Sequence, residues 1–478
     1  MGVLLGLDIG TTKICALALD AESGSPLAIE DAYNDTQLPV QPDAAEQDPK
    51  SVVRKSFALL KTLLQRPELA DTEVLGIGVT GQMHGVCIID ADGEPITPLV
   101  TWQDRRGTRP YQTTGRTYAE ELAARLGEDA VESSGCAPAT GYGGVTLLRM
   151  REEATMPKSG RALTIHDFVV HALCGAAVTD PTDAASWGIF DVRDGGHWLR
   201  GAVDALRLPD GMLPEVQPTG TIAGKLTPEA AQAIGLKPGV PVAVAFGDNQ
   251  ASFVGSVPSL RDTLLMNLGT GGQMSAPVGH FTRAFGLDTR PLTNGAWLLV
   301  GASLCGGRAY QVLELFYASV GRDLFGIHNT TRLYDQMNDL AAEAKEDCGG
   351  LMACTMFEGT RLDSSSRGSI QDLDTRNFTA GNLTRAIVIG MVEELVEFFD
   401  VACKVGATPA FLAGSGNAVR RNATVRLEIE KRVNMRLRMP PHAEEAAVGA
   451  ALAGGVAAGV YPDWQAAGET LYRDAYIG

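Results

Sequence analysis

Residues 6–13 read Gly-Leu-Asp-Ile-Gly-Thr-Thr-Lys and come directly after a short apolar run. That run, residues 3–7, has the pattern of a strand, and residues 13–20 continue with side chains that strands tolerate. We therefore expect residues 8–12 to form the turn between two strands. Because glycine has no Cβ atom, backbone N–H groups in such a turn can approach an anion closely, although a lone Gly-Thr-Thr turn is also an ordinary hairpin.

A second stretch of the chain repeats this pattern. Residues 263–277 read Thr-Leu-Leu-Met-Asn-Leu-Gly-Thr-Gly-Gly-Gln-Met-Ser-Ala-Pro. Asp8 aligns with Asn267, and Thr11 aligns with Thr270 at the same offset. Two copies of a strand–turn–strand unit indicate two related halves, and their two turns could hold one polyphosphate together.

The length of 478 residues allows two or more domains. Residues 254–260 have the Pro, Ser and Gly content of a linker, so we predict domains at 1–254 and 255–478. Strand-like and helical patterns alternate within each half, which predicts an α/β fold with mixed sheets. The expected strands include residues 74–79, 240–246, 297–300 and 411–413, and the expected helices include residues 49–64, 385–402 and 444–458.

Composition and charge predict the compartment and the partners of the protein. The formal net charge is −17, with 57 acidic against 40 basic residues, so nucleic acid is not an expected partner. The eight cysteines are scattered without a C-x-x-C pair, which is typical of a reducing compartment. The longest apolar stretch, residues 446–460, is shorter than the ~20 residues of a membrane span. We therefore expect a cytoplasmic protein with no membrane partner.

Asp8 and Asp248 are candidate functional carboxylates. Asp8 has no acidic counterpart in the second copy, and phosphate groups repel a carboxylate unless a cation lies between them. Mg²⁺ accepts one or two carboxylates together with phosphate oxygens, so Asp8 is a candidate metal ligand. Asp248 follows the apolar run 240–246, at a strand end where α/β sheets bind ligands, and could accept a hydroxyl proton. It could equally cap the helix that follows.

Two polar clusters interrupt apolar sequence at residues 79–90 and 99–107. Several hydrogen-bonding side chains beside an aromatic ring are what a sugar site requires. The candidates are Gln82, His84, Trp102 and Asp104. A structural histidine and a core tryptophan are the alternative interpretations of two of them.

Six motifs occur in an order that resembles the FGGY family of carbohydrate kinases, over nearly the whole chain. They are Asp8-Ile-Gly-Thr-Thr, Gln82-Met-His-Gly, Trp102-Gln-Asp-Arg-Arg, Gly247-Asp-Asn-Gln, Leu268-Gly-Thr-Gly-Gly and Ala413-Gly-Ser-Gly-Asn. The resemblance implies two actin-like, ribonuclease-H-like ATPase domains with a cleft between them. It also implies ATP and Mg²⁺ as cofactors and the phosphorylation of a sugar hydroxyl.

The resemblance implies roles for individual residues as well. Asp248 would be the general base, and Asp8 and Asp248 would bind the metal. The ATP contacts would be Thr11, Thr12, Lys13, Thr270, Gly271, Gly307, Gln311, Gly414 and Asn417. The sugar contacts would be Gln82, Met83, His84, Trp102, Asp104, Asp248 and Asn249.

The resemblance also narrows the acceptor. Met83 and His84 stand where glycerol-phosphorylating members have an Arg-Glu pair, so a ketose is the expected small-molecule partner. Residues 140–143 and 183–188 resemble members that phosphorylate sedoheptulose to its 7-phosphate. The glycine-rich turn 269–272 is nearer to members that act on xylulose, so a pentulose is the alternative.

A protein of another class is the remaining alternative. A non-catalytic actin-type nucleotide-binding protein would have the phosphate turns without a polar sugar pocket, and a sugar sensor would have the pocket without the turns. The sequence has both features. A homodimer is compatible with the sequence.

Overall fold

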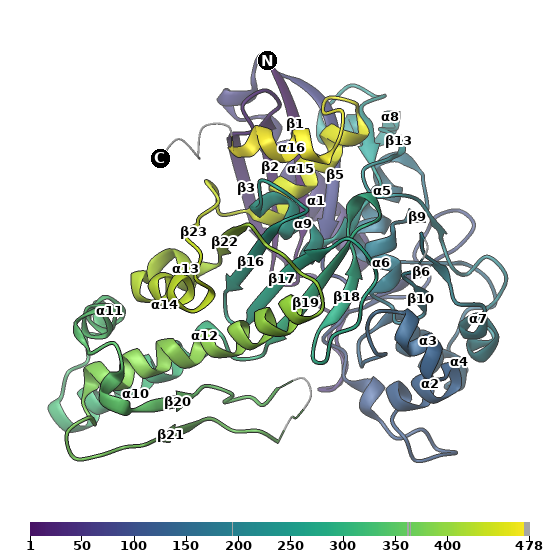
Figure 1. Ribbon diagram of the computed structural model, residues 1–478. Coiled ribbons are helices and arrows are strands. Elements are labelled where there is room, and N and C mark those ends of the chain that lie inside the picture. Colours follow the sequence, from purple (N-terminus) through teal and green to yellow (C-terminus); the bar gives the residue numbers. More distant parts are fainter. Residues whose placement is uncertain (194, 361–362, 364, 473–478) are drawn as a thin grey trace.

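The structure is a computed structural model that describes residues 1–193, 195–360, 363 and 365–472. Each half of the chain contributes one large mixed β-sheet, and helices pack on the sheet faces (Figure 1). The predicted α/β class with mixed sheets flanked by helices is therefore confirmed. The strands expected at residues 74–79, 297–300 and 411–413 and the helix expected at 49–64 are all present.

The first sheet has the strand order β13-β14-β5-β1-β2-β3 along its described residues, and a short strand, β15, pairs with the end of β5. Its strands are β1 (Gly2–Ile9), β2 (Lys13–Asp20), β3 (Pro26–Tyr33), β5 (Glu73–Gly81), β13 (Ile222–Lys225), β14 (Pro241–Ala243) and β15 (Phe246–Gly247). β1 and β2 form the expected hairpin, and β5 runs parallel to β1. The turn between β1 and β2 therefore lies at the same edge of the sheet as the end of β5.

The second sheet repeats this arrangement in the order β18-β19-β17-β16-β22-β23. Its strands are β16 (Thr263–Leu268), β17 (Gly272–Val278), β18 (Asp288–Pro291), β19 (Trp297–Ser303), β22 (Phe411–Ser415) and β23 (Leu437–Arg438). The β16–β17 hairpin matches the β1–β2 hairpin, and β22 runs parallel to β16 as β5 does to β1. The repeat found in the sequence therefore corresponds to the same arrangement of strands in both halves: an antiparallel hairpin whose first strand also pairs with a parallel strand.

Helices cover both sheets, and a second group of elements lies beyond the sheets. The helices of the first half are α1 (Pro49–Leu64), α2 (Tyr118–Leu126), α3 (Glu128–Ser133), α4 (Gly143–Glu152), α5 (Ile165–Cys174), α6 (Pro181–Ala185), α7 (Arg200–Leu206), α8 (Pro228–Ile234) and α9 (Asp248–Ser256). Those of the second half are α10 (Gly307–Phe325), α11 (Leu333–Glu343), α12 (Ala380–Lys404), α13 (Asn417–Arg421) and α14 (Ala423–Val433). Short two-strand sheets join β4 (Glu46–Gln47) to β7 (Leu99–Val100), β6 (Cys87–Ile89) to β8 (Arg161–Leu163), β9 (Val178–Thr179) to β12 (Glu215–Val216), β10 (Phe190–Asp191) to β11 (His197–Trp198), and β20 (Met352–Cys354) to β21 (Ser369–Gln371).

Helix ends follow the capping signals of the sequence. α1 begins at Pro49, whose missing N–H costs nothing at the first helical position, and the side chain of Asp48 accepts a hydrogen bond from Lys50 N. α5 begins with a capping box in which Thr164 and Asp167 exchange side-chain and backbone hydrogen bonds, and it ends at the left-handed Gly175. These local signals explain why the predicted helix at 49–64 has the observed bounds.

Two helices from the end of the chain return to the first sheet. α15 (Glu445–Ala457) packs on β1, β5 and α9, and α16 (Trp464–Tyr472) packs against α15 (Figure 1). Both helices share a hydrophobic core with Leu4, Leu17 and Phe246 of the first half. The domain division at residue 254 remains a prediction, and the first sheet is covered by residues that the prediction assigned to the second half.

Glycines let α15 approach the first sheet at backbone contact. A Cβ atom at Gly6 would overlap the carbonyl oxygen of Ala447. A Cβ atom at Gly78 would overlap the carbonyl oxygen of Ala450. Gly255 of α9 likewise faces the backbone of α15. The helix position therefore depends on the absence of side chains at these sites.

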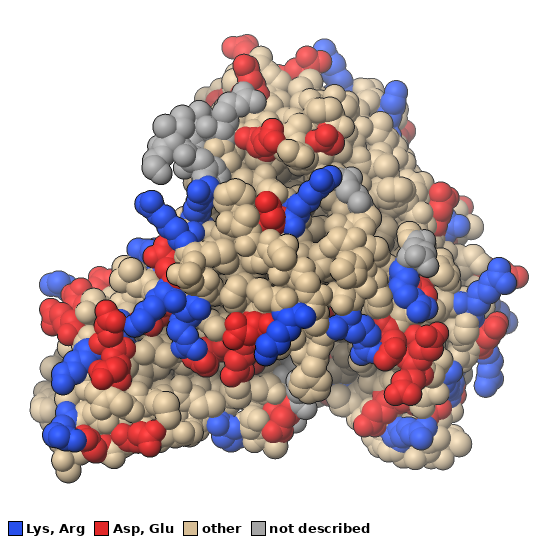
Figure 2. All heavy atoms as spheres, viewed as in Figure 1, with Lys and Arg blue, Asp and Glu red and all other residues tan. Residues whose placement is uncertain are grey.

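The surface carries both signs of charge. Figure 2 shows Lys and Arg side chains beside Asp and Glu side chains across the face in view. Among the described residues, no helix is both long enough and apolar enough to cross a membrane.

The contact between α15 and the sheet gives a stability prediction. Gly78→Ala should destabilise the protein by about 1–3 kcal/mol, because the added methyl group must displace backbone atoms of α15 rather than a flexible side chain. The melting temperature, measured by differential scanning calorimetry, should fall by several degrees. Gly201→Ala is the matched control, because Gly201 has open space around it in α7, and it should leave the melting temperature unchanged or raise it slightly. Equal melting temperatures for Gly78→Ala and the wild type would contradict the close backbone contact between Gly78 and α15.

Candidate active site

A central cavity of about 350 Å³ lies where the two halves meet. Its walls come from both sheets, from α9, which connects them, and from the start of α15. The lining residues are Asp8, Thr11, Met83, His84, Trp102, Asp248, Asn249, Ser252, Gln273, Arg290 and Ala446. The first seven are candidates from the sequence, and the structure brings them together around one space.

Asp8 and Asp248 are the two carboxyl groups that line the cavity. Burial, together with the nearby carboxylates of Asp248 and Glu444, raises the pKa of Asp8 to about 8. Burial also raises the pKa of Asp248, while His166 and Arg290 act in the opposite direction. Burial therefore disfavours the ionised form of both groups, and the charge of Asp248 adds to this effect at Asp8.

The two carboxylates fit a divalent cation. Asp8 Oδ1 is buried and makes no hydrogen bond to the described residues. Within those residues, no cluster of three or more His, Cys, Asp or Glu side chains could hold a metal ion by itself. Mg²⁺ commonly takes one or two carboxylates and completes its shell with water and phosphate oxygens, so the donor set suits a Mg–nucleotide rather than an isolated ion.

Asp248 is the first residue of α9 and not its N-cap. Gly247 occupies the cap position and makes no side-chain capping bond. The two residues before Asp248 are tied down, because Thr80 Oγ1 donates to Phe246 O at 2.6 Å and Gly247 N donates to Thr182 Oγ1 at 2.8 Å. Asp248 thus does not occupy the N-cap position, although its carboxylate still interacts with backbone N–H groups of the first turn, and it lines the cavity.

His84 and Trp102 form part of the first-half wall. His84 has a φ of 74°, an unusual backbone conformation for a residue with a side chain, and its ring stacks on Tyr142 at 4.1 Å between centroids. Its Nδ1 lies 2.7 Å from Ser186 O. Trp102 is 47% exposed and donates from Nε1 to Thr11 Oγ1 at 2.9 Å, so it is a wall residue rather than a core residue.

Three predicted site residues lie behind or beside the cavity. Gln82 is buried and supports Thr11, whose Oγ1 donates to Gln82 Oε1 at 3.1 Å. Asp104 is also buried, and its carboxylate accepts hydrogen bonds from Arg106 and from a backbone N–H. Lys13 forms a two-point ion pair with Glu444 at 2.8 and 2.9 Å. Direct sugar or ATP contacts by these three residues remain predictions.

The two glycine turns are held in the same way. In the first turn, Asn34 donates from its side chain to Gly10 O at 2.8 Å and from its backbone to Thr12 O at 2.7 Å. In the second turn, Gly269 O accepts from Gly307 N at 2.8 Å, and Thr270 O accepts from the next N–H of α10 at 3.0 Å. In both turns, two carbonyl groups are occupied by neighbouring donors, which fixes the turn.

A second cavity of about 500 Å³ lies beside the second turn, between α10, α11, α12, α13 and α14. It is lined by Gly269, Thr270, Gly307, Arg308, Tyr310, Gln311, Glu314, Thr331, Tyr334, Met391, Asn417, Ala418, Arg421, Asn422 and Val425. Thr270, Gly307, Gln311 and Asn417 are candidates from the sequence. Thr12, Gly271 and Gly414 line neither this cavity nor the central one, and Gly414 packs against Val419 and Leu437 below α13.

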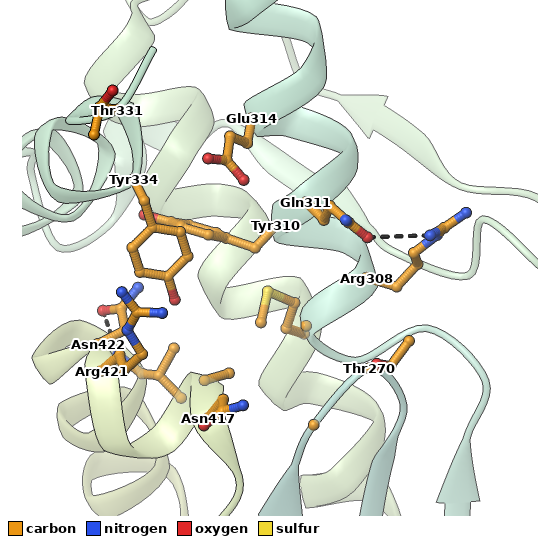
Figure 3. A pocket seen from close by; sticks show the side chains of 15 residues that line it. Thr270, Arg308, Tyr310, Gln311, Glu314, Thr331, Tyr334, Asn417, Arg421 and Asn422 are labelled. Atoms are coloured by element: carbon orange, nitrogen blue, oxygen red, sulfur yellow. Dashed lines mark hydrogen bonds between the residues drawn. The ribbon is translucent and has the colours of Figure 1, made fainter. Parts of the chain in front are cut away.

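Aromatic rings at one end of the second cavity were missed by the sequence analysis. Figure 3 shows Tyr334 beside both Tyr310 and Arg421. The two tyrosine rings meet edge to face at 5.3 Å, and the Arg421 guanidinium lies 5.2 Å from the centre of the Tyr334 ring. Tyr310 lies between the candidates Gly307 and Gln311 in the sequence, which could have signalled it. Tyr334 lies on α11, in a segment that carries no motif. A planar, aromatic-lined end suits a nucleotide base.

The chain is similar to known carbohydrate kinases. Residues 3–255 match the N-terminal domain of the FGGY family of carbohydrate kinases. The human protein named sedoheptulokinase is 28% identical, with 94% of this chain and 96% of that protein covered. A xylulose kinase of Staphylococcus xylosus is 22% identical, with 90% and 86% covered. The crystal structure of xylulose kinase from Rhodospirillum rubrum superposes with a TM-score of 0.87 at 22% identity, covering 98% of this chain and 92% of the other.

The aromatic end of the second cavity gives a binding prediction. Tyr334→Ala should raise the KM for ATP about tenfold or more, because removing one aromatic contact to a nucleotide base costs about 1–3 kcal/mol. The KM for the acceptor should stay within twofold, since Tyr334 does not border the central cavity. Steady-state kinetics with each substrate varied in turn checks both values. Phe285→Ala is the control, because Phe285 is 84% exposed and borders neither cavity. An unchanged KM for ATP in Tyr334→Ala would exclude a base contact.

Proposed function

The chain belongs to the FGGY family of carbohydrate kinases, and we propose that it transfers the γ-phosphoryl group of ATP to the primary hydroxyl of a ketose, with sedoheptulose as the substrate. The observation that carries the proposal is one hairpin that borders both cavities. Gly269 and Thr270, in its turn, border the aromatic-ended cavity, and Gln273, on β17, borders the central cavity. A nucleotide in the first space would direct its phosphates along this hairpin toward a sugar in the second.

Asp248 carries the acceptor chemistry of the proposal. It lies in the central cavity at the first position of α9, on backbone that is fixed by Thr80 and Thr182. Phosphoryl transfer requires positioning and charge neutralisation more than covalent participation by the protein. Asp248 would orient the primary hydroxyl and accept its proton as the hydroxyl oxygen bonds to the γ-phosphorus, while the bond between this phosphorus and the β,γ-bridging oxygen breaks and ADP leaves.

The phosphate groups would lie between the two fixed glycine turns. Thr11 of the first turn borders the central cavity, and Thr270 of the second turn borders the nucleotide cavity. Asp8, with Asp248, would hold the divalent cation, and Mg²⁺ bound there supplies positive charge that offsets the charge on the phosphate oxygens. Walls from both halves would exclude water, which would otherwise compete with the sugar for the phosphoryl group.

The choice of acceptor rests on sequence similarity and on one wall of the cavity. The relatives named sedoheptulokinase align over nearly their whole length. Met83 and His84 line the cavity, so no Arg-Glu pair stands at these positions to bind a triol. The ring of His84 is held by Tyr142 and Ser186, so it could offer a hydroxyl of the acceptor a fixed hydrogen-bonding partner.

A pentulose is the second candidate acceptor. A relative named xylulose kinase aligns over 90% of the chain. The glycine-rich turn 269–272 also resembles family members that act on xylulose. The two candidates share the chemistry at the reacting hydroxyl and differ only in chain length.

The assignment of Asp248 gives a kinetic prediction. Asp248→Asn should lower kcat by about 10²–10⁴-fold, because the amide cannot accept the hydroxyl proton. Binding of a non-hydrolysable ATP analogue, measured by isothermal titration calorimetry without Mg²⁺ so that the metal contact of Asp248 does not contribute, should remain within threefold. Asp204→Asn removes an exposed carboxylate on α7 and should leave kcat unchanged. A kcat near the wild-type value in Asp248→Asn would remove Asp248 from the role of base.

A coupled assay of ATP consumption tests the acceptor. With sedoheptulose, xylulose, ribulose and glycerol at equal concentrations, we expect the highest kcat/KM for sedoheptulose and the lowest for glycerol. A higher value for xylulose would select the pentulose alternative. ATP binding without consumption in the presence of any of these sugars would favour the non-catalytic alternative.

A further inference from the structure

Arg290 is an arginine from the second half of the chain that lines the central cavity. It lies on β18, the edge strand of the second sheet, and no motif in the sequence marked it. Arg290 is 6% exposed, so the protein encloses it almost completely. A buried guanidinium is costly unless its donors find partners, so its place in a ligand cavity calls for a functional explanation.

The hydrogen bonds of Arg290 leave most of its donors available. One Nη atom donates to Asp288 Oδ2 at 2.9 Å. No other hydrogen bond joins the Arg290 side chain to the residues that the structure describes. A guanidinium has five N–H donors in a planar fork. The remaining donors are not among the buried groups that lack a partner, so they are accessible from the cavity.

The backbone on both sides of Arg290 is fastened across the junction of the two halves. Thr289 N donates to Gly135 O at 2.8 Å. Pro291 O accepts from Gln250 Nε2, on α9, at 3.0 Å. β18 also packs against α6 of the first half. Arg290 is therefore held in a fixed place before any ligand enters, which is what a binding residue needs for selectivity.

We propose that Arg290 binds the acceptor sugar, donating hydrogen bonds to its hydroxyl or carbonyl oxygens, and that it selects an uncharged polyhydroxylated acceptor over a sugar acid. This inference rests on the proposed function of the central cavity. The cavity itself supplies the selection, because Asp288 already pairs with the guanidinium and Asp8 and Asp248 face the same space. The Asp288 carboxylate already offsets the charge of the guanidinium, so an anionic acceptor gains little net attraction from it, whereas neutral oxygens can still accept from the free N–H groups.

The test compares two substitutions of Arg290 with a matched arginine. Arg290→Gln should raise the KM for the ketose at least tenfold, because hydrogen bonds from a charged donor are lost, and the KM for ATP should stay within threefold. Arg290→Lys keeps the charge beside Asp288 but not the planar fork, so it should fold normally and give an intermediate KM. Arg283→Gln is the control, because Arg283 also joins the second half to the first, through Glu132, but is exposed and outside the cavity. Melting temperatures establish that each variant is folded.

Gluconate serves as the anionic probe. The wild type should phosphorylate a ketose with a kcat/KM at least a hundredfold higher than that for gluconate. A ketose KM that is unchanged in both folded Arg290 variants would overturn the binding role, and efficient use of gluconate would overturn the selection. A wild type that phosphorylates no sugar would contradict the proposed function itself, whereas an active wild type with unaffected Arg290 variants would contradict only this inference.

Discussion

The architecture depends on the close approach of α15 to the first sheet. Gly6 and Gly78 present no side chain to the helix, so its backbone lies against β1 and β5 and its opposite side meets α9. α9 begins with Asp248, and β1 ends at Asp8 and Ile9. β1 and β15 both pair with β5, so strand pairing places the two carboxyl groups on one edge of the sheet. The missing Cβ atoms of Gly6, Gly78 and Gly255 let α15 pack directly behind this arrangement.

The two hairpins differ in the residues at their turns, but the same kind of hydrogen bond holds both turns. Each turn has two carbonyl groups bound by neighbouring donors, from Asn34 in the first half and from the start of α10 in the second. At the equivalent position, the first half has Asp8 and the second has Asn267. The first turn thus lies beside the central cavity with its two carboxyl groups, and the second lies beside the aromatic-ended cavity, so the two copies of one unit border different spaces.

Local patterns in the sequence predicted most of the strands, the hairpins and the residues at strand ends, but the single strand expected at 240–246 was wrong, because two short strands, β14 and β15, stand there with a break at 244–245. Asp8, His84 and Asp248 could be grouped because parallel strands bring their carboxyl ends to one edge of a sheet. Tyr334 and Arg290 could not, because each reaches its cavity through packing between segments far apart in the chain. Asp104 shows another limit: its motif was recognised, but the sequence did not reveal that its buried carboxylate pairs with Arg106, and its contact with a sugar remains a prediction. Motifs identify residue sets, and tertiary contacts decide which members face the ligand.

The chain passes between its halves twice, and the two crossings are neighbours. The first follows α9, the second precedes α15, and His442 Nε2 lies 2.8 Å from Gly255 O where they meet. Glu445, at the start of α15, pairs with Arg420 of α13 across the same junction. Because the two covalent connections lie side by side, a rotation of one half about this place would strain the chain less than a translation of one sheet past the other.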